Sequence, residues 1–389
     1  MEAKHRAAIF LFCILAISLP ARADEPLTVQ TPTLKLTVDA AKGVFALQSL
    51  RSNNTFVPTA QLSGGKGRAT VFEPHDTTFG KGAGIEVVYP NGAHDQLALY
   101  PDLPFLLIRS VMHNDTKSDA RVTSIRPFAA TINLGKPPAD LRALSTAGLT
   151  PADHHPGGYE WIAVADPQTR HGVVAGWLTH DRGSGVMFCN AAGNQVTIQP
   201  QLDYGRLRIQ AGQEATTETL AIGYFDDARL GLEAWADAVA KVYHVHLPPK
   251  PVGYCTWYSD KHGGASDEKS LAMITAFAAK ELAPFGFSLI QIDDGWQEGV
   301  KHNGPKKVFT EFNPKGPYPS GMKATAQNIT RDGLTPGIWF MPFAGTFDDP
   351  FFKDHQDWFA KTEDGKPFVS SWGGTSLDMT QATARLYLR

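Results

Sequence analysis

The sequence predicts an antiparallel β-sandwich followed by a series of parallel β/α units. Residues 27–225 contain many short segments in which apolar residues alternate with polar ones, separated by turn residues, as is typical of a sandwich. From Val252 onward, apolar strand-like runs alternate with helical patterns, which indicates a parallel sheet. A stiff proline-rich connector at 247–251 separates the two patterns. We therefore expect one domain at 24–245 and a second at 246–389.

The composition suits a chain of strands and loops. The 389 residues are enough for two domains, and 42% of them are hydrophobic, which allows a sizeable core. The 36 glycines and 27 prolines fit a protein with many turns. Disorder is therefore not expected.

The first 23 residues have the features of a secretory signal peptide. Lys4 and Arg6 precede an apolar run of about 13 residues that is too short to span a bilayer, and residues 21–23 (Ala-Arg-Ala) offer a cleavage pattern. We expect cleavage after Ala23 and a secreted or periplasmic protein. No other long apolar run follows, so no membrane association is expected after cleavage.

Charge and cysteine content exclude several classes of function. Removing residues 1–23 leaves 33 basic and 38 acidic residues out of 36 and 39, a net charge of −5. There is no basic tract, so nucleic acid is not an expected partner. Cys189 and Cys255 remain, far apart in sequence, and we expect two buried free thiols rather than a disulfide framework.

The expected elements follow in chain order. Sandwich strands are expected at 27–30, 34–38, 43–47, 84–89, 105–111, 121–125, 161–165, 172–178, 195–199 and 207–210. An acidic start and apolar residues at helical spacing predict an amphipathic helix at 227–243 that closes the first domain.

The second domain should contain three strands and three helices. Strands are expected at 252–257, 287–292 and 335–340, a helix capped by residues 266–268, a second helix at 322–332 and a third opening at Thr380. The stretches 297–320 and 341–376 are predicted to be long loops.

Two adjacent carboxylates follow the second of these strands. The run Leu289 to Ile292 reads as a buried strand, and Asp293, Asp294, Gly295 and Trp296 come directly after it. Barrel enzymes carry their chemistry at the carboxyl ends of their strands. Carboxylates are rarely buried without partners, so this pair needs a metal, an arginine or hydroxyl groups. The neighbouring indole favours a sugar, because an aromatic face packs on the apolar side of a pyranose ring.

Three strand ends in order resemble one family. Residues 253–258 (GYCTWY), 290–297 (IQIDDGWQ) and 333–340 (GLTPGIWF) are similar to the first three barrel strands of secreted bacterial melibiase-type α-galactosidases, which are retaining glycoside hydrolases. The preceding domain resembles the N-terminal β-supersandwich of that family, notably at 105–110 and 176–185. The resemblance implies a β-supersandwich followed by a (β/α)8 TIM barrel.

The resemblance also implies a set of substrate-binding residues. Asp293 and Asp294 would hold the axial 4-hydroxyl and the 6-hydroxyl of galactose, Trp257 would close on the sugar and Trp339 would line the pocket. Trp296 either stacks on the sugar or pins its loop. No metal or other cofactor is expected, because no third carboxylate or histidine falls at ligand spacing.

The resemblance places the catalytic pair outside this chain. The family carries its nucleophile after strand four and its acid/base after strand six, whereas the 144 residues from His246 to Arg389 are fewer than the roughly 250 of a whole barrel. We expect no catalytic residue before Arg389. The chain should therefore be the N-terminal part of an enzyme, truncated before strand four and inactive alone.

The substrate stays open at this point. Many relatives carry an arginine shortly before a Leu-Asp motif, and residues 370–376 contain none before Leu377-Asp378. An α-galactoside oligosaccharide or glycan, an N-acetyl-α-galactosaminide and an acceptor in transglycosylation are all compatible, as is a non-catalytic sugar-binding role. A homo-oligomer is possible.

Overall fold

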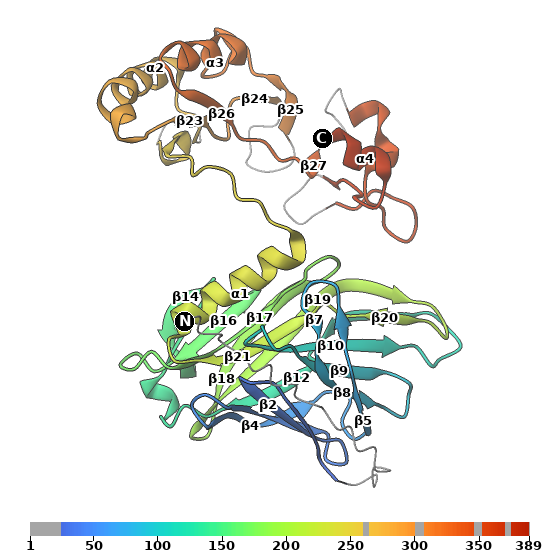
Figure 1. Ribbon diagram of the computed structural model, residues 1–389. Helices are drawn as coiled ribbons and strands as arrows, with labels where there is room; N and C mark the ends of the chain where they lie inside the picture. Colours follow the sequence, from blue (N-terminus) through green and yellow to red (C-terminus); the bar gives the residue numbers. More distant parts are fainter. Residues whose placement is uncertain (1–24, 260–263, 300–306, 346–351, 370–374, 389) are drawn as a thin grey trace, which may run out of the picture. The chain divides into compact units, whose positions relative to one another are not determined.

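The computed structural model describes residues 25–259, 264–299, 307–345, 352–369 and 375–388. These fall into two compact units, one ending at His246 and the other beginning at Leu247 (Figure 1). The predicted signal peptide and its cleavage site lie outside the described residues.

The first unit is built on two large antiparallel sheets. The first sheet has the order β1-β2-β3-β4-β12-β19-β18-β15, with β11 paired to β19. Its strands are β1 Leu27–Gln30, β2 Leu34–Asp39, β3 Val44–Ser49, β4 Asn54–Leu62, β11 Ala120–Ile125, β12 Phe128–Ile132, β15 Gly158–Tyr159, β18 Ser184–Ala192 and β19 Gln195–Ile209.

The second sheet has the order β14-β13-β16-β17-β21-β10-β9-β8-β5, with β20 paired to β10. Its strands are β5 Arg68–Phe72, β8 Ala83–Val88, β9 His94–Leu99, β10 Leu106–His113, β13 Arg142–Ser145, β14 Gly148–Pro151, β16 Trp161–Ala165, β17 Gly172–Trp177, β20 Glu214–Thr216 and β21 Leu220–Phe225. A small hairpin, β6 His75–Asp76 with β7 Gly80–Lys81, and two 3₁₀ helices, η1 Pro138–Asp140 and η2 Ala152–His154, complete the connections.

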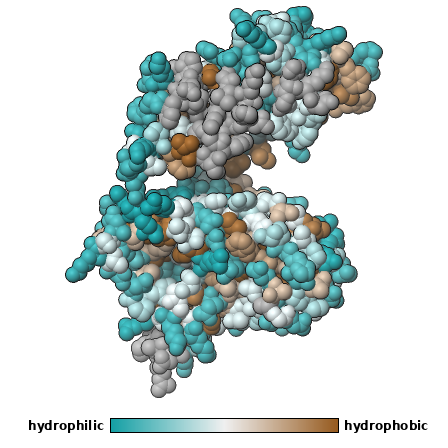
Figure 2. Space-filling model, turned by 180° about the vertical axis from the view of Figure 1, so that it is seen from behind, coloured by the Kyte–Doolittle hydropathy of each residue, from teal (hydrophilic) through white to brown (hydrophobic). Residues whose placement is uncertain are grey.

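The sandwich core lies between the two sheets. Strand β2 alternates between buried and half-buried residues, so that Leu34, Leu36 and Val38 all point inward and join one large apolar cluster. Inward residues of the second sheet, such as Ile85 and Leu97, belong to the same cluster. From the side shown in Figure 2, the outer surface of this unit is mostly hydrophilic. The predicted antiparallel sandwich is confirmed.

Helix α1 (Ala228–Tyr243) packs on the outer face of the second sheet, against β16, β17 and β21 (Figure 1). Asp227 caps it by accepting the Arg229 N–H. The half-buried Trp235 and Val239 lie on its sheet-facing side in a second apolar cluster. The helix predicted at 227–243 is therefore present, one residue shorter at its start.

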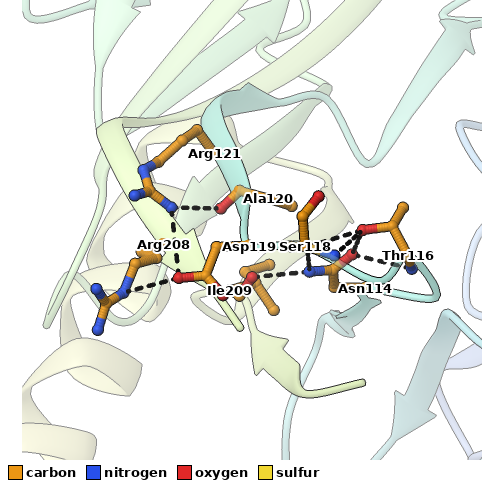
Figure 3. Close-up of polar contacts among 8 residues, drawn as sticks. All are labelled: Asn114, Thr116, Ser118, Asp119, Ala120, Arg121, Arg208 and Ile209. Carbon is orange, nitrogen blue, oxygen red and sulfur yellow. Dashed lines mark hydrogen bonds and ion pairs between the residues drawn. The ribbon is translucent and has the colours of Figure 1, made fainter. Parts of the chain in front are cut away.

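Asn114 fixes the point where the chain crosses from the second sheet to the first. Its side-chain amide is buried and donates to the carbonyls of Ser118 and Ile209, both at 2.9 Å, while its oxygen accepts from Thr116. Figure 3 shows this turn beside the ion pair of Asp119 with Arg208, 3.6 Å long. The crossing is thus tied to β19 at both ends.

The second unit contains three parallel strands with the order β22-β23-β26. They are β22 Gly253–Cys255, β23 Leu289–Ile292 and β26 Thr335–Ile338. A Cβ atom on Gly253 would lie 2.3 Å from the Leu289 carbonyl oxygen, so only glycine permits this close pairing. The predicted strand positions are confirmed, with shorter bounds.

Helices connect these strands in the right order for β/α units. Between β22 and β23 lie η3 Thr256–Tyr258, α2 Glu268–Phe277, the π-helix η5 Ala278–Leu282 and η6 Ala283–Phe285, and α3 Gly321–Arg331 lies between β23 and β26. The short helices η7 Phe352–Asp354, η8 Gln356–Trp358 and α4 Ala382–Tyr387 follow β26. Asp267 caps α2 by accepting the Ser270 N–H at 2.8 Å, as the sequence predicted. Ile290 and Ile292 form the core with residues of α2 and α3.

The prediction of a loop at 297–320 is wrong in part. It contains an antiparallel hairpin, β24 Gln297–Gly299 with β25 Lys307–Phe312. A second pair, β27 Ala344–Gly345 with β28 Thr375–Ser376, also lies in a predicted loop. β24, β27 and β28, with two or three residues each, are too short for alternation to be visible in the sequence, whereas the six residues of β25 were missed among the turn residues around them.

Both cysteines are free thiols, as predicted, although Cys189 is buried and Cys255 only half-buried. Among the described helices, none has the length and apolarity needed to cross a membrane.

Candidate substrate-binding site

The carboxyl ends of the three parallel strands meet at one edge of the sheet. Cys255 on β22 pairs with Gln291 on β23, which in turn pairs with Gly337 on β26. The residues that follow each strand therefore emerge side by side. Trp257, the Asp293–Asp294 pair and Trp339 all lie in these following segments.

Thr256 ties the first two strand ends together. Its side chain is fully buried, and its oxygen accepts the Asp293 N–H at 2.8 Å while its hydroxyl donates to the Gly264 carbonyl at 2.6 Å. The Thr256 hydroxyl therefore fixes the position of Asp293 next to the end of β22, and it also anchors the chain at Gly264.

The Asp293 carboxylate is buried but only weakly bound by its neighbours. It is 8% exposed. Its Oδ1 accepts the Asp294 N–H at 2.8 Å, whereas among the described residues Oδ2 has only the Cys255 thiol at 3.2 Å and the Gln291 amide at 3.4 Å. Burial raises the pKa of Cys255, and its hydrogen bond to Asp293 raises it further, so the thiol stays protonated and donates. Since a thiol is a weak donor, Oδ2 keeps capacity for a better one.

Asp294 is held by a local turn. It is 2% exposed, and its Oδ1 accepts from the Gln297 amide nitrogen at 3.1 Å. The oxygen of the same amide accepts the Gly295 N–H at 2.8 Å. Gly295 has φ +113°, a conformation that residues with a side chain rarely adopt. Gln297 thus closes the turn and orients Asp294.

Trp296 pins the ends of the second and third strands. It is buried in the core of the unit, and its indole N–H donates to the Trp339 carbonyl at 2.9 Å. The Trp339 N–H donates to the Ile292 carbonyl at 2.8 Å. Of the two roles that the sequence left open for Trp296, this burial favours the pinning role over stacking on a sugar.

Trp257 and Trp339 remain accessible. The Trp257 side chain is among the exposed large hydrophobics at 45%, and a Cβ on Gly264 would lie 2.5 Å from its six-membered ring, so the ring rests on a glycine backbone. Trp339 is half-buried and meets Phe309 of β25 edge-on, with ring centroids 5.8 Å apart. Two indoles next to two carboxylates make an amphipathic surface suited to a polyhydroxylated ring.

Several of these residues were not singled out by sequence reasoning. Thr256 and Gln297 lie within the runs 253–258 and 290–297 but were given no role of their own, Gly264 belongs to no motif, and Phe309 lies in a stretch that was predicted to be a loop. Asp378 accepts from the Thr380 N–H and hydroxyl in the turn before α4. Residues 370–374, where relatives carry an arginine nearby, lie outside the described residues. Within the described ranges, no group of three or more His, Cys, Asp or Glu side chains could hold a metal ion.

The structure thus has a β-sandwich followed by the first parallel strands of a barrel, with carboxylates and indoles at the strand ends, the arrangement on which the resemblance to melibiase-type α-galactosidases rests. More particularly, residues 264–388 match the family model described as melibiase. The melibiase-type resemblance is thereby confirmed.

Solved structures support the fold along nearly the whole chain. The GH36 α-galactosidase AgaA from Geobacillus stearothermophilus matches 94% of this chain and 63% of its own, with 13% identity and a TM-score of 0.55. A variant of the same enzyme in complex with raffinose has the same coverage and identity, with a TM-score of 0.56. The α-galactosidase from Lactobacillus brevis matches 95% of this chain and 62% of its own, with 14% identity and a TM-score of 0.52.

These matches confirm the predicted fold class, a sandwich with part of a TIM barrel. The chain spans less than two thirds of the length of these enzymes.

Proposed function

We propose that this chain supplies the galactose-binding part of an enzyme that hydrolyses terminal α-linked galactose. The observation that supports the proposal best is the adjacent Asp293 and Asp294 at the end of β23, beside the accessible rings of Trp257 and Trp339. Acceptors next to aromatic surfaces match the two faces of a pyranose ring.

The two carboxylates would select galactose by its axial hydroxyl. Asp293 would accept from the 4-hydroxyl or 6-hydroxyl through Oδ2, displacing the weak contact with Cys255, and Asp294 would accept from the other. A sugar with an equatorial 4-hydroxyl would leave a buried acceptor without a donor, which costs about 1–3 kcal/mol or more for a charged group. Such a site discriminates strongly between epimers.

The reaction would be a retaining hydrolysis. In such enzymes one carboxylate attacks the anomeric carbon and a second, roughly 5–5.5 Å away, protonates the leaving oxygen. The family resemblance assigns these roles to residues that follow the fourth and sixth barrel strands, so we assign neither role to a residue of this chain. Asp293, Asp294 and the two indoles would hold the sugar in place during both steps.

The substrate would be an α-galactoside oligosaccharide, the class that includes the raffinose held by the AgaA variant. The N-terminal pattern at residues 1–23 supports a secreted or periplasmic location. A related α-N-acetylgalactosaminidase is the second candidate, because residues 370–376 lack the arginine found in many relatives.

The test is release of nitrophenol from p-nitrophenyl α-galactoside and from p-nitrophenyl N-acetyl-α-galactosaminide by the product of the complete reading frame. We expect turnover of the galactoside, and loss of that turnover in Asp293→Asn and Asp294→Asn. If the second candidate is right, the N-acetyl-α-galactosaminide is turned over faster than the galactoside. Asp332→Asn is the matched control, since this exposed residue lies before β26, at the opposite edge of the sheet.

No turnover of either substrate, together with no galactose binding by equilibrium dialysis, would overturn the proposal. Galactose binding without turnover would support the non-catalytic sugar-binding alternative instead.

A further inference from the structure

The first unit contains a cavity of its own, far in sequence from the barrel strands. Its volume is about 540 Å³, within the range of small-ligand sites. Four segments line it: the start of β2, the turn after β3, the connection between β9 and β10, and the junction of β21 with α1. All four belong to the sandwich, so the cavity is complete within one unit.

The aromatic part of the wall is packed against the sandwich core. Tyr224 and Phe225 lie at the junction, and their ring centroids are 5.7 Å from Phe56 and 5.2 Å from Phe105 respectively. Leu230 on the first turn of α1 adds an exposed apolar side chain, 59% exposed. This side of the cavity offers apolar and aromatic surface to a ligand.

The polar part of the wall carries groups that the fold does not use. Arg51, Asp102 and Asp226 line the cavity from exposed positions, and no side-chain hydrogen bond or ion pair joins any of them to another residue that the structure describes. Asp227 is different, because Arg229 binds its carboxylate at 2.7 Å and Arg170 at 3.5 Å. One guanidinium and two carboxylates are thus left to face the cavity.

This combination points to a neutral ligand rich in hydroxyl groups. An anion would meet the two carboxylates, and a cation would meet the guanidinium. A saccharide can donate to Asp102 and Asp226, accept from Arg51, and lay its apolar face on an aromatic ring. We propose that the cavity at the β21–α1 junction is a second saccharide-binding site, separate from the strand-end site, for one or two sugar units of an oligosaccharide.

The experiment measures binding of radiolabelled raffinose by equilibrium dialysis in an Asp294→Asn background. The Asp294→Asn substitution removes turnover and weakens binding at the strand-end site. Raffinose is the probe because this inference rests on the proposed function, in which the substrate is an α-galactoside oligosaccharide. We expect saturable binding of one raffinose per chain. Leu230→Trp, which fills the cavity from an exposed position, and Asp226→Asn should each weaken it at least tenfold.

Leu149→Trp is the matched control, since Leu149 is a similarly exposed leucine, 66% exposed, on β14 and away from the cavity. It should leave raffinose binding unchanged.

Absence of saturable binding in the Asp294→Asn protein would overturn the proposal. Binding that Leu230→Trp and Asp226→Asn leave unaltered would overturn it equally. If instead the proposed function at the strand end is wrong, the result is different. The unsubstituted protein and the Asp294→Asn variant would then bind one raffinose with the same affinity, and neither would hydrolyse a galactoside.

Discussion

Two buried aspartates, one in each unit, occupy very different surroundings. Asp95 on β9 is 2% exposed, and both its oxygens are taken, one by the Tyr89 hydroxyl and the other by the Ser110 hydroxyl at 2.5 Å. Asp293 after β23 is 8% exposed, yet within the described part of the chain its Oδ2 has only a thiol and a distant amide as donors. The sandwich saturates its carboxylate, whereas the strand end leaves its carboxylate partly unsatisfied.

The difference separates a structural carboxylate from one poised for a ligand. Burying a carboxylate is costly unless hydrogen bonds replace its hydration. At Asp95 the Tyr89 and Ser110 hydroxyls replace the lost hydration of the carboxylate. Asp95 therefore stabilises the folded state through these two hydrogen bonds. At Asp293 the replacement is incomplete, and a sugar hydroxyl can finish it. The two sites should therefore respond in opposite ways to substitution.

The largest expected effect is on binding at the strand end. Asp293→Asn should lower kcat/KM for p-nitrophenyl α-galactoside by about 100-fold or more, because a hydrogen bond to a charged group contributes about 1.5–3 kcal/mol and the substituted amide also presents a donor where a hydroxyl must donate. Urea unfolding should show a free energy of unfolding within about 1 kcal/mol of the unsubstituted protein. A fully active Asp293→Asn enzyme would contradict the comparison.

The second effect is the converse one, on stability alone. Asp95→Ala should lower the free energy of unfolding of the sandwich by about 2–5 kcal/mol, because the Tyr89 and Ser110 hydroxyls would each lose their acceptor in the core. Urea titration followed by far-UV circular dichroism measures this change. The folded fraction should keep its kcat/KM. Loss of activity without loss of stability would assign Asp95 a role at a ligand site.

The pH dependence of stability sharpens the same contrast. Burial raises the pKa of Asp95 above its ordinary value of 3.8, against the opposing effect of the two hydroxyls. Its contribution to stability is therefore complete below about pH 3.8 and is lost as the pH rises through the raised pKa, because the unfolded chain releases this proton first.

Asp95→Asn removes this titration. The free energy of unfolding of the variant, minus that of the unsubstituted protein, should rise across this pH window and be flat above it. Urea titrations at a series of pH values provide the difference, in which the other carboxylates cancel. A difference independent of pH would show that Asp95 ionises normally.

The sequence was a good guide where one segment determines the structure. The acidic residues ahead of α1 predicted its start, and Asp227 caps it. The apolar run before Asp293 predicted β23 and the carboxylate pair at its end. It failed where distant segments cooperate: β19 runs from Gln195 to Ile209 through Pro200 and Gly205, which interrupt the alternation and suggested two shorter strands.

The site shows the same limit. Asp293 and Asp294 were predicted from their place in one segment, and Gln297 of the same turn holds Asp294, but the Thr256 and Cys255 groups that contact Asp293 come from another strand end. Thr256 is 37 residues before Asp293 and eight before Gly264, and it is hydrogen-bonded to both. Neither contact can be recognised from the sequence. Trp296 has the composition of a sugar-stacking residue, and only its buried position reveals the hydrogen bond to Trp339.

The smallest expected effect concerns the thiol beside Asp293. Cys255→Ala removes one weak donor from Oδ2 and leaves the Asp294 N–H on Oδ1. We expect KM for the galactoside to change by no more than about threefold and kcat to stay the same, since a thiol is a weak hydrogen-bond donor and the sugar hydroxyl would take its place on Oδ2. Steady-state kinetics with Cys255→Ser as a second variant measures the effect. A loss as large as that of Asp293→Asn would mean that the thiol, rather than a sugar hydroxyl, satisfies the carboxylate, and Asp293 would then resemble Asp95.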